Sequence, residues 1–248
     1  MLLLIDAGNT RIKWACARAD AAPGDWTAHG AVAHADIVEL AAQWRQAGLM
    51  PLRALMSNVA GSAVFEQVAA QLRAIAPVLQ LDAFTSLPAC AGLVNGYRNP
   101  FQLGSDRFAA AIGARTLLPG QALIVATCGT ATTVDAIDTS GRFIGGMILP
   151  GLGLMASSLA RNTAQLPQVR DNAPMPAGFA DNTDDAILAG CVAAQAGAIE
   201  RAVAMLGAAT CILSGGAARY IAPALRTPHR LIDNIVLLGL HAASLAKE

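Results

Sequence analysis

Charged and aromatic residues are scarce in this chain of 248 residues, at 14% and 4% of the composition. Soluble domains carry about 25% charged residues on average, so the surface is short of charge unless part of it is covered. The 17 basic and 17 acidic residues give a formal net charge of +0. No Lys/Arg cluster is longer than a pair, whereas binding nucleic acid requires a concentrated basic face. The composition therefore argues against nucleic acid as the main partner.

Long apolar runs and paired cysteines are missing as well. Pro150 and Gly151 interrupt the longest apolar run and His241 another, so neither reaches the roughly 18–20 residues of a membrane span. The opening segment, residues 1–6, is too short for a secretory signal and has no basic region. We therefore expect a cytoplasmic protein with no membrane partner. Five scattered cysteines without C-x-x-C spacing favour reduced, mostly buried thiols over disulfides or zinc: Cys16, Cys90, Cys128, Cys191 and Cys211.

Three common catalytic motifs are also absent. The chain contains no G-x-x-x-x-G-K-[ST] loop, no protein-kinase motif set and no G-x-S-x-G turn. These absences exclude a Walker-type nucleotide site and an α/β-hydrolase.

The apolar pattern predicts an α/β fold. Strands are expected at 2–5, 12–17, 26–32, 52–56 and 78–81, and helices at 36–47, 62–75 and 104–118. Asp36 and Ser62 are predicted to cap the first two helices, and Gly48 to end the first. Strands that alternate with helices indicate a layered α/β arrangement.

The second half of the chain repeats this opening. Strands are expected at 122–126, 132–137, 143–149 and 210–213, with helices at 182–206, after the Ser214-Gly215-Gly216 turn, and at 234–246. Each half places a Gly and a Thr directly after its first strand, which suggests a duplicated lobe. The Pro119-Gly120 pair is the predicted boundary, giving lobes 1–118 and 119–248.

The segment Asp6–Lys13 carries the sharpest chemical signal. A carboxylate at a strand end, followed by a hairpin with glycine, offers a metal ligand beside backbone N–H donors, and a bound phosphate needs both. Lys13 would add positive charge. An ordinary hairpin with a capping Asp explains this segment equally well when it is taken alone.

Two further loops fit the same chemistry. Residues 128–133 supply small residues and hydroxyls, so that two loops could hold a polyphosphate. Residues 214–217 lie between a strand and a helix, where the backbone can approach a ligand closely.

Residues 104–107 form a candidate substrate site at a helix start. Asp106 could simply complement the helix dipole. Beside Arg107, however, its carboxylate is suited to accept a hydroxyl proton while the guanidinium holds an acidic substrate. Tyr97 lies in the loop that leads to this helix.

Three other features have ordinary explanations. The segment starting at Gly151 matches G-x-G-x-x-A but ends a meander instead of opening a βαβ unit, which argues against a Rossmann site. The acidic residues at 181, 184 and 185 are expected at a helix start. The four histidines show no ligand spacing and are expected in solvent or at helix ends.

Taken together, the motifs resemble those of the type III pantothenate kinases, and the likeness runs nearly end to end. It rests on D-x-G-N-T-x-x-K from Asp6, Tyr97 with G-x-D-R from Gly104, and G-T-A-x-T-x-D from Gly129. G-G-x-I-x-P-G from Gly145, Asn182-Thr183 and the Gly-Gly turn at 215 complete the set. Several ordered motifs at compatible spacings are far more specific than any one of them.

The resemblance implies a fold, an activity and partners. The fold is α/β, with two duplicated ribonuclease H-like lobes of the acetate kinase, sugar kinase, Hsp70 and actin superfamily, each a mixed sheet with flanking helices. The activity is ATP-dependent phosphorylation of pantothenate to 4'-phosphopantothenate, the first step of coenzyme A synthesis, by a homodimer that uses Mg²⁺.

The resemblance also assigns roles to residues. Asp106 looks like the general base, Asp6 like the residue that organises the metal, and Thr130 like an ATP contact in the second loop. The first phosphate loop would comprise Asp6, Ala7, Gly8, Asn9, Thr10, Arg11, Ile12 and Lys13. The pantothenate contacts would be Tyr97, Gly104, Ser105, Asp106, Arg107 and Thr183.

One departure and two alternatives stay open. Members of the family commonly have an Asp at the position of Thr127, and it resembles a ligand for K⁺ or NH₄⁺. A neutral hydroxyl is a weaker ligand, so a monovalent cation is an open question for this chain. The alternatives are a kinase of another small hydroxylated substrate and a non-catalytic accessory protein on the same scaffold, which would be expected to have lost Asp6 or Asp106.

Overall fold

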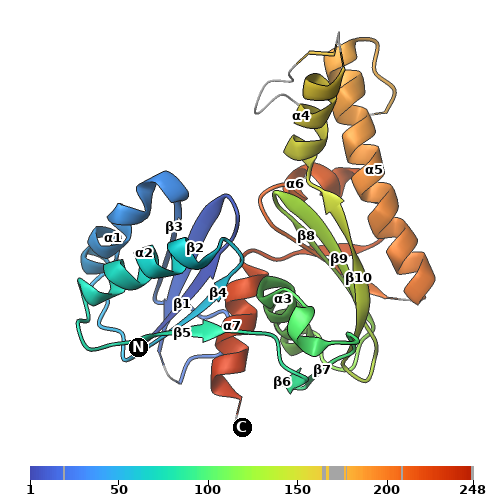
Figure 1. Cartoon of the computed structure of the whole chain (residues 1–248). Helices are drawn as coiled ribbons and strands as arrows, with labels where there is room; N and C mark the ends of the chain where they lie inside the picture. The colour runs from blue at the N-terminus through green and yellow to red at the C-terminus, as the bar shows by residue number, and fades with distance from the viewer. Residues whose placement is uncertain (19, 164–165, 168–175, 177, 208, 247–248) are drawn as a thin grey trace. The chain divides into compact units, whose positions relative to one another are not determined.

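The chain forms two compact units. The computed structural model describes residues 1–18, 20–163, 166–167, 176, 178–207 and 209–246 (Figure 1). The first unit comprises Met1–Pro119, Gly141–Phe143 and Asn234–Glu248, and the second Gly120–Ser140 and Ile144–Asp233. The chain first passes from one unit to the other between Pro119 and Gly120, one residue after the lobe boundary predicted at 118/119. The C-terminal helix, however, belongs to the first unit, so the units are not two continuous segments.

The first unit is built on a five-stranded mixed sheet of order β3-β2-β1-β4-β5. The strands are β1 (Leu2–Ala7), β2 (Arg11–Ala17), β3 (Ala28–Ala33), β4 (Arg53–Asn58) and β5 (Leu81–Phe84). The meander of β1, β2 and β3 is antiparallel, whereas β4 runs parallel to β1. The carboxyl ends of β1 and β4 therefore meet at one edge of the sheet.

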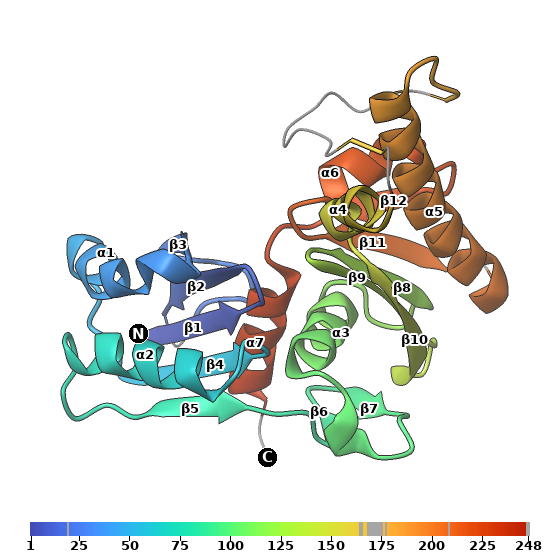
Figure 2. The same ribbon diagram turned by 45° about the horizontal axis from the view of Figure 1, so that its top comes forward.

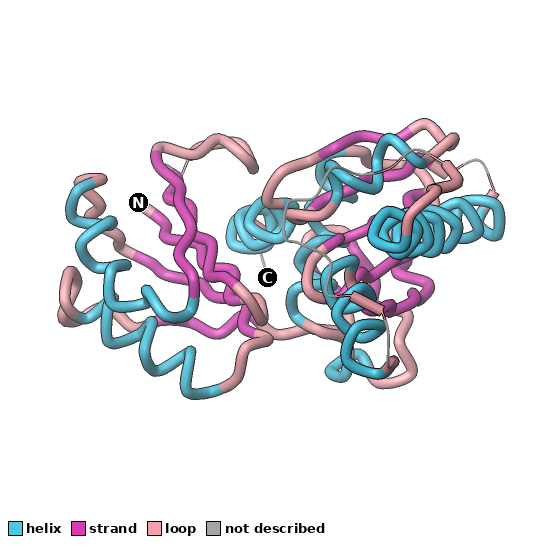
Figure 3. The backbone as a smooth tube through the Cα atoms, turned by 90° about the horizontal axis from the view of Figure 1, so that it is seen from above, coloured by secondary structure: helices cyan, strands magenta, loops and turns pink. Residues whose placement is uncertain are grey.

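Helices α1 (Leu40–Gln46) and α2 (Ser62–Arg73) cover one face of this sheet (Figures 2 and 3). Their apolar side chains join those of the strands in one core, which includes Leu3, Trp14, Trp44, Met56 and Leu72. A 3-10 helix, η1 (His34–Glu39), precedes α1.

Three predictions for this region were wrong in detail. Asp36 lies inside η1 with non-helical dihedral angles and caps nothing. Gly61, with φ 96°, occupies the N-cap of α2, and Ser62 is the first helical residue. The strand predicted at 78–81 is β5, three residues later, because Val78 lies in a turn and is 97% exposed.

Two helices, α3 (Ser105–Leu117) and α7 (Ile235–Leu245), pack against each other at very short range. A Cβ atom on Gly113 would lie 2.6 Å from the Ile235 carbonyl oxygen, and one on Gly239 would collide with the Ala109 carbonyl. Any larger residue would force the helices apart. This close packing explains why the end of the chain belongs to the first unit.

A short hairpin completes the first unit. Strands β6 (Ala89–Cys90) and β7 (Leu93–Asn95), which the sequence did not reveal, precede the 3-10 helix η2 (Pro100–Gln102). Strand β7 pairs in parallel with Arg142 and Phe143, the first residues of β10 (Arg142–Pro150). This pairing brings Phe143 to the loop that leads into α3.

The second unit contains a mixed sheet of order β12-β11-β8-β9-β10. Its further strands are β8 (Leu123–Cys128), β9 (Ala131–Ile137), β11 (Thr210–Ser214) and β12 (His229–Leu231). Strands β8 and β9 are antiparallel, and β11 runs parallel to β8, as β4 does to β1 in the first unit. The repeated opening predicted from the sequence therefore corresponds to the same strand arrangement in both units.

Helices α4 (Leu152–Asn162), α5 (Thr183–Leu206) and α6 (Ala218–Ile221) and the 3-10 helix η3 (Ala222–Ala224) belong to the second unit. Their buried residues share a core with β8 and β11 that includes Ile124, Leu188, Ile199 and Leu213. Helix α5 is long and apolar enough to cross a membrane by length and composition alone, with a mean hydropathy of 1.3, which corrects the prediction that no segment reaches that length. One such helix is weak evidence for a membrane span, and 44% of this window is buried, with Leu188 and Ile199 in the core that α5 shares with β8 and β11.

The cysteine prediction is confirmed, whereas the histidine prediction was wrong for His241. All five cysteines are free thiols, and four of them are buried. His241 is 0% exposed, and its ring lies 5.4 Å from that of Trp26, centroid to centroid. Neither ring nitrogen has a hydrogen-bond partner among the described residues.

His241 should make the protein less stable in acid. Burial lowers its pKa from 6.5, against the opposing effect of the Asp25 carboxylate. Below about pH 6.5 the unfolded chain therefore binds a proton that the folded chain does not, and the free energy of unfolding falls. From pH 7.5 to pH 5.5, the free energy of unfolding should fall by up to about 1.4 kcal/mol less in His241→Leu than in the wild-type protein, as measured by urea unfolding at both pH values. His29→Leu, at an exposed position, is the control. An equal loss in wild type and His241→Leu would contradict this assignment.

Candidate functional site

The site in the first unit begins with Asp6, near the end of β1. In the sheet register, Asp6 lies opposite Lys13 on the antiparallel neighbour and opposite Ser57 on the parallel one. Directly paired residues of neighbouring strands project their side chains from the same face. Asp6 therefore has a cation on one side and a hydroxyl on the other.

The turn after Asp6 is held by hydrogen bonds of its backbone. The Gly8 N–H donates to the Arg11 carbonyl at 3.2 Å, and the Ala7 carbonyl accepts from the Val59 N–H at 3.0 Å. The Gly8 carbonyl is bonded to Nε2 of His34 at 2.8 Å. Of the predicted loop residues, Ala7 and Ile12 have buried side chains in the core, whereas Asn9, Thr10 and Arg11 are exposed. Ala7 and Ile12 can therefore serve a ligand through their backbone only.

Ser57 connects the Asp6 strand to the start of α3. Its side chain is 0% exposed, and its Oγ lies 2.9 Å from Oγ of Ser105, the first residue of α3. Sequence reasoning missed Ser57. The signal was its position near the end of a strand that runs parallel to β1, but parallel pairing could not be known beforehand.

Both Asp6 and Asp106 have raised pKa values, and the charge of Asp106 contributes to the shift of Asp6. Burial raises the pKa of Asp6 from 3.8 to about 7, Lys13 opposes the rise, and the nearby Asp106 adds to it. Burial also raises the pKa of Asp106, opposed by the hydrogen bond from the Arg107 N–H to its Oδ1 at 2.8 Å and by the Arg107 charge. The structure thus brings together the predicted metal-organising residue and the predicted base.

Arg107 is held by two aromatic rings. The residue is 7% exposed, its Nη1 donates to the Tyr97 hydroxyl at 2.8 Å, and its guanidinium carbon lies 5.6 Å from the Tyr97 ring centroid and 5.8 Å from that of Phe143. The two rings meet edge to face at 5.7 Å. Guanidinium groups are attracted to aromatic faces at this range. Tyr97 therefore orients Arg107, and Phe143 is a second residue that sequence reasoning missed.

The loop that carries Tyr97 is fixed by Asn95, which is buried. The Asn95 Nδ2 donates to the carbonyls of Leu87 and Pro100 at 3.2 and 3.0 Å, and its Oδ1 accepts from the Tyr97 N–H at 3.1 Å. Gly104 precedes α3 as its N-cap. A Cβ atom on Gly104 would lie 2.7 Å from Oδ1 of Asp106, so a side chain there would displace the carboxylate.

Thr130 and Thr183 belong to the second unit. Thr130 lies in the exposed turn between β8 and β9, where the Gly129 N–H donates to the Ala131 carbonyl at 3.0 Å and the Thr130 carbonyl accepts from the Gly151 N–H at 2.9 Å. A Cβ atom on Gly151 would collide with the backbone of this turn, and one on Gly215 would collide with the backbone of Cys128, the last residue of β8. Gly151, in the segment that matches G-x-G-x-x-A, and Gly215, in the third loop, therefore allow the backbone to pack against the second loop, residues 128–133.

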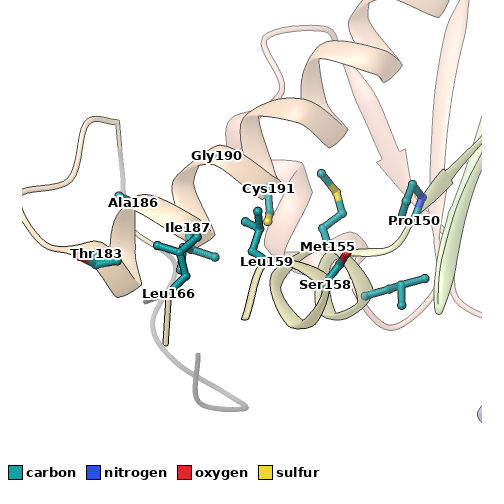
Figure 4. Close-up of a pocket in the computed structure, with 11 residues that line it drawn as sticks. Pro150, Met155, Ser158, Leu159, Leu166, Thr183, Ala186, Ile187, Gly190 and Cys191 are labelled. Atoms are coloured by element: carbon teal, nitrogen blue, oxygen red, sulfur yellow. The ribbon is translucent and has the colours of Figure 1, made fainter. Parts of the chain in front are cut away.

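Thr183 is the first residue of α5 and lines an apolar groove between α4 and α5 of about 750 Å³. Its lining includes Leu154 and four residues that Figure 4 labels, Met155, Leu159, Ile187 and Cys191. The three aspartates predicted as caps flank this helix start, but the capping side chain is Asn182, whose Oδ1 accepts from the Asp185 N–H at 3.0 Å.

Comparisons with known proteins agree with this picture. A family model described as type III pantothenate kinase matches residues 2–205. A protein of Herminiimonas arsenicoxydans named type III pantothenate kinase is 53% identical over 254 residues, which cover 99% of this chain and 98% of that protein. The chain belongs to the type III pantothenate kinase family.

Solved structures of more distant proteins share the fold. A Sinorhizobium meliloti protein described as a 2-dehydro-3-deoxygalactonokinase matches with a TM-score of 0.60 at 14% identity, covering 99% of this chain and 98% of that one. An activator of 2-hydroxyisocaproyl-CoA dehydratase from Clostridium difficile matches with a TM-score of 0.54 at 14% identity, covering 98% and 92%. The predicted α/β fold, with a mixed sheet and flanking helices in each unit, is thereby confirmed for this member of the pantothenate kinase family.

The electrostatic coupling in this kinase family member can be tested without any substrate. Burial is the main cause of the raised pKa of Asp6, and the Asp106 charge adds to it. Asp106→Asn removes that smaller contribution, so the pKa of Asp6 should fall part of the way, whereas Lys13→Met should raise it further. The side-chain carboxyl ¹³C shift of Asp6, followed by NMR against pH, measures both effects. Asp82→Asn, at an exposed position of β5, should leave the Asp6 titration unchanged. An Asp6 pKa that is the same in Asp106→Asn and in the wild-type protein would show that the two carboxylates are not coupled.

Proposed function

We propose that this protein phosphorylates pantothenate with ATP, giving 4'-phosphopantothenate, the first step of coenzyme A synthesis. The observation that carries the proposal is the proximity of two carboxylates within the first unit, Asp6 near a lysine and Asp106 next to a guanidinium held by aromatic rings. Phosphoryl transfer needs little more than positioning and charge neutralisation, and these groups supply both. Membership in the type III pantothenate kinase family supports the choice of substrate.

In the proposed mechanism Asp106 accepts the proton of the pantothenate hydroxyl as it attacks the terminal phosphate. The raised pKa of Asp106 suits this role, because a general base transfers protons best when its pKa approaches the working pH. The hydrogen bond from the Arg107 N–H fixes the Asp106 carboxylate at the start of α3. Gly104 leaves room for the carboxylate in that position.

Asp6 would hold the Mg²⁺ that accompanies ATP, and Lys13 would place a positive charge near the phosphates. Carboxylate oxygens are the ligands that Mg²⁺ prefers, and Mg²⁺ in nucleotide sites takes one or two carboxylates with phosphates and water. The described residues contain no group of three acidic, His or Cys side chains that could form a complete cage, which fits a metal that arrives with ATP. A positive charge beside Asp6 would offset the burial that disfavours its ionised form. Bound Mg²⁺ would neutralise charge that develops on the phosphate oxygens.

Arg107 is proposed to bind the carboxylate of pantothenate, since a guanidinium pairs with a carboxylate through two parallel hydrogen bonds. Tyr97, Gly104, Ser105 and Thr183 are proposed as further substrate contacts, and Thr130 as a contact for ATP. A K⁺ or NH₄⁺ ion near Thr127 stays an open part of the proposal. The Thr127 hydroxyl has no hydrogen-bond partner among the described residues, but it lacks the charge of a carboxylate.

We also propose a cytoplasmic homodimer. Leu154 and Leu159, both exposed to solvent by more than a third, line the apolar groove of the second unit, and Ile148 is 65% exposed on β10. A second copy of the chain packed over these apolar residues would explain the low proportion of charged residues in the composition. Both Asp6 and Asp106 are retained, which disfavours the non-catalytic accessory alternative.

The role of Asp106 is tested by Asp106→Asn, which keeps the shape of the side chain and removes the base. We expect kcat to fall by about 10²–10⁴-fold, the usual contribution of general-base catalysis, with little change in ATP affinity. ADP release with Mg²⁺-ATP and pantothenate measures the rate, and Asp82→Asn serves as the control. Retention of most of the wild-type kcat would refute the assignment.

Arg107→Ala should weaken pantothenate binding selectively. The loss of a charged hydrogen-bond donor should raise KM for pantothenate by about tenfold or more, while KM for ATP changes less than twofold. Arg98→Ala is the matched control, because Arg98 is exposed in the loop that leads to α3. An equal rise of both KM values would mean that Arg107 supports the fold and does not contact pantothenate.

A further inference from the structure

His34, which no motif singled out, contacts the proposed phosphate loop. It is the first residue of η1, directly after β3, and lies half-buried. Its Nε2 is 2.8 Å from the Gly8 carbonyl oxygen. A carbonyl oxygen can only accept a hydrogen bond, so Nε2 must carry the proton, as it does in one neutral tautomer and in the imidazolium ion.

This hydrogen bond fixes the direction of a whole peptide group. The Gly8 carbonyl and the Asn9 N–H belong to the same planar peptide, which is trans because the chain has no cis peptide bond among its described residues. In a trans peptide the C=O and N–H bonds point in opposite directions. By holding the carbonyl, His34 therefore turns the Asn9 N–H away from itself.

The direction of the Asn9 N–H matters because the neighbouring backbone groups already make hydrogen bonds within the protein. The Gly8 N–H and the Ala7 carbonyl are used within the protein, by Arg11 and Val59. Asn9 is exposed, and its N–H has no partner among the described residues. A rotated peptide would instead present the Gly8 carbonyl oxygen, whose partial negative charge repels a phosphate.

We propose that His34 is a positioning residue for ATP: its Nε2–H holds the Gly8 carbonyl and thereby aims the Asn9 N–H at a phosphate oxygen. The proposal rests on the proposed function, because it takes the turn after Asp6 as a phosphate loop. In this proposal His34 acts only through the backbone of the loop and makes no contact of its own with the substrates. Its effect should therefore appear in ATP binding and not in the proton transfer at Asp106.

The test compares His34→Ala with His34→Gln. The alanine variant loses the donor, whereas the glutamine amide nitrogen can reach about the place of Nε2. We expect His34→Ala to raise KM for ATP, and Kd for Mg²⁺-ADP measured by calorimetry, about fivefold to tenfold, with KM for pantothenate unchanged. His34→Gln should recover most of this loss. His29→Ala is the matched control, since His29 is an exposed histidine on β3.

Four outcomes are decisive. Equal changes in the two KM values, or a glutamine variant as weak as the alanine variant in a protein with wild-type Tm, would overturn the positioning role. A proton on Nδ1 instead of Nε2 in the ¹⁵N spectrum of neutral His34 would also overturn it. Failure of the wild-type protein to bind Mg²⁺-ADP or to phosphorylate pantothenate would instead refute the proposed function.

Discussion

The arrangement of the first unit depends on one polar connection between a strand and a helix. Ser57, fully buried near the end of β4, shares a hydrogen bond with Ser105 at the start of α3. On one side of this bond lies Asp6, one strand away, and on the other lies Asp106, one residue further along the helix. A buried hydroxyl left without a partner is costly, so this pair resists separation. Two carboxylates with raised pKa values are thereby kept close together.

Close backbone contacts provide the rigidity that such a site requires. Gly239 and Gly113 allow α3 and α7 to approach until backbone meets backbone, which anchors the helix that carries Asp106 and Arg107. In the second unit, Gly151 packs against the turn that contains Thr130, and Gly215 against Cys128 at the end of β8. Close backbone contacts at glycines thus fix helix α3 in the first unit and the second loop in the second unit.

Much of this could be predicted from the sequence, and the failures have physical causes. Apolar runs located most strands, and the carboxylate–glycine pattern identified Asp6, because both signals are local. Ser57 and Phe143 could not be predicted as site residues, because strand pairing places them there. Ser57 pairs with Asp6 on β1 and Phe143 with Asn95 on β7, and both partners are distant in sequence. The histidines were expected in solvent or at helix ends. His34 does lie at the start of η1, but its bond to the Gly8 carbonyl depends on a residue distant in sequence, and His241 lies inside α7, buried against Trp26. The lobe boundary missed the return of α7, which depends on Gly113 and Gly239.

The two carboxylates are proposed to act in the transfer of phosphate from ATP to pantothenate. The most direct measurement is ADP release with Mg²⁺-ATP across a panel of small alcohols and hydroxy acids, with and without K⁺. We expect pantothenate to stimulate ADP release far more than the other acceptors do, with formation of phosphorylated pantothenate. ADP release that is unaffected by pantothenate, or that responds more strongly to another acceptor, would contradict it.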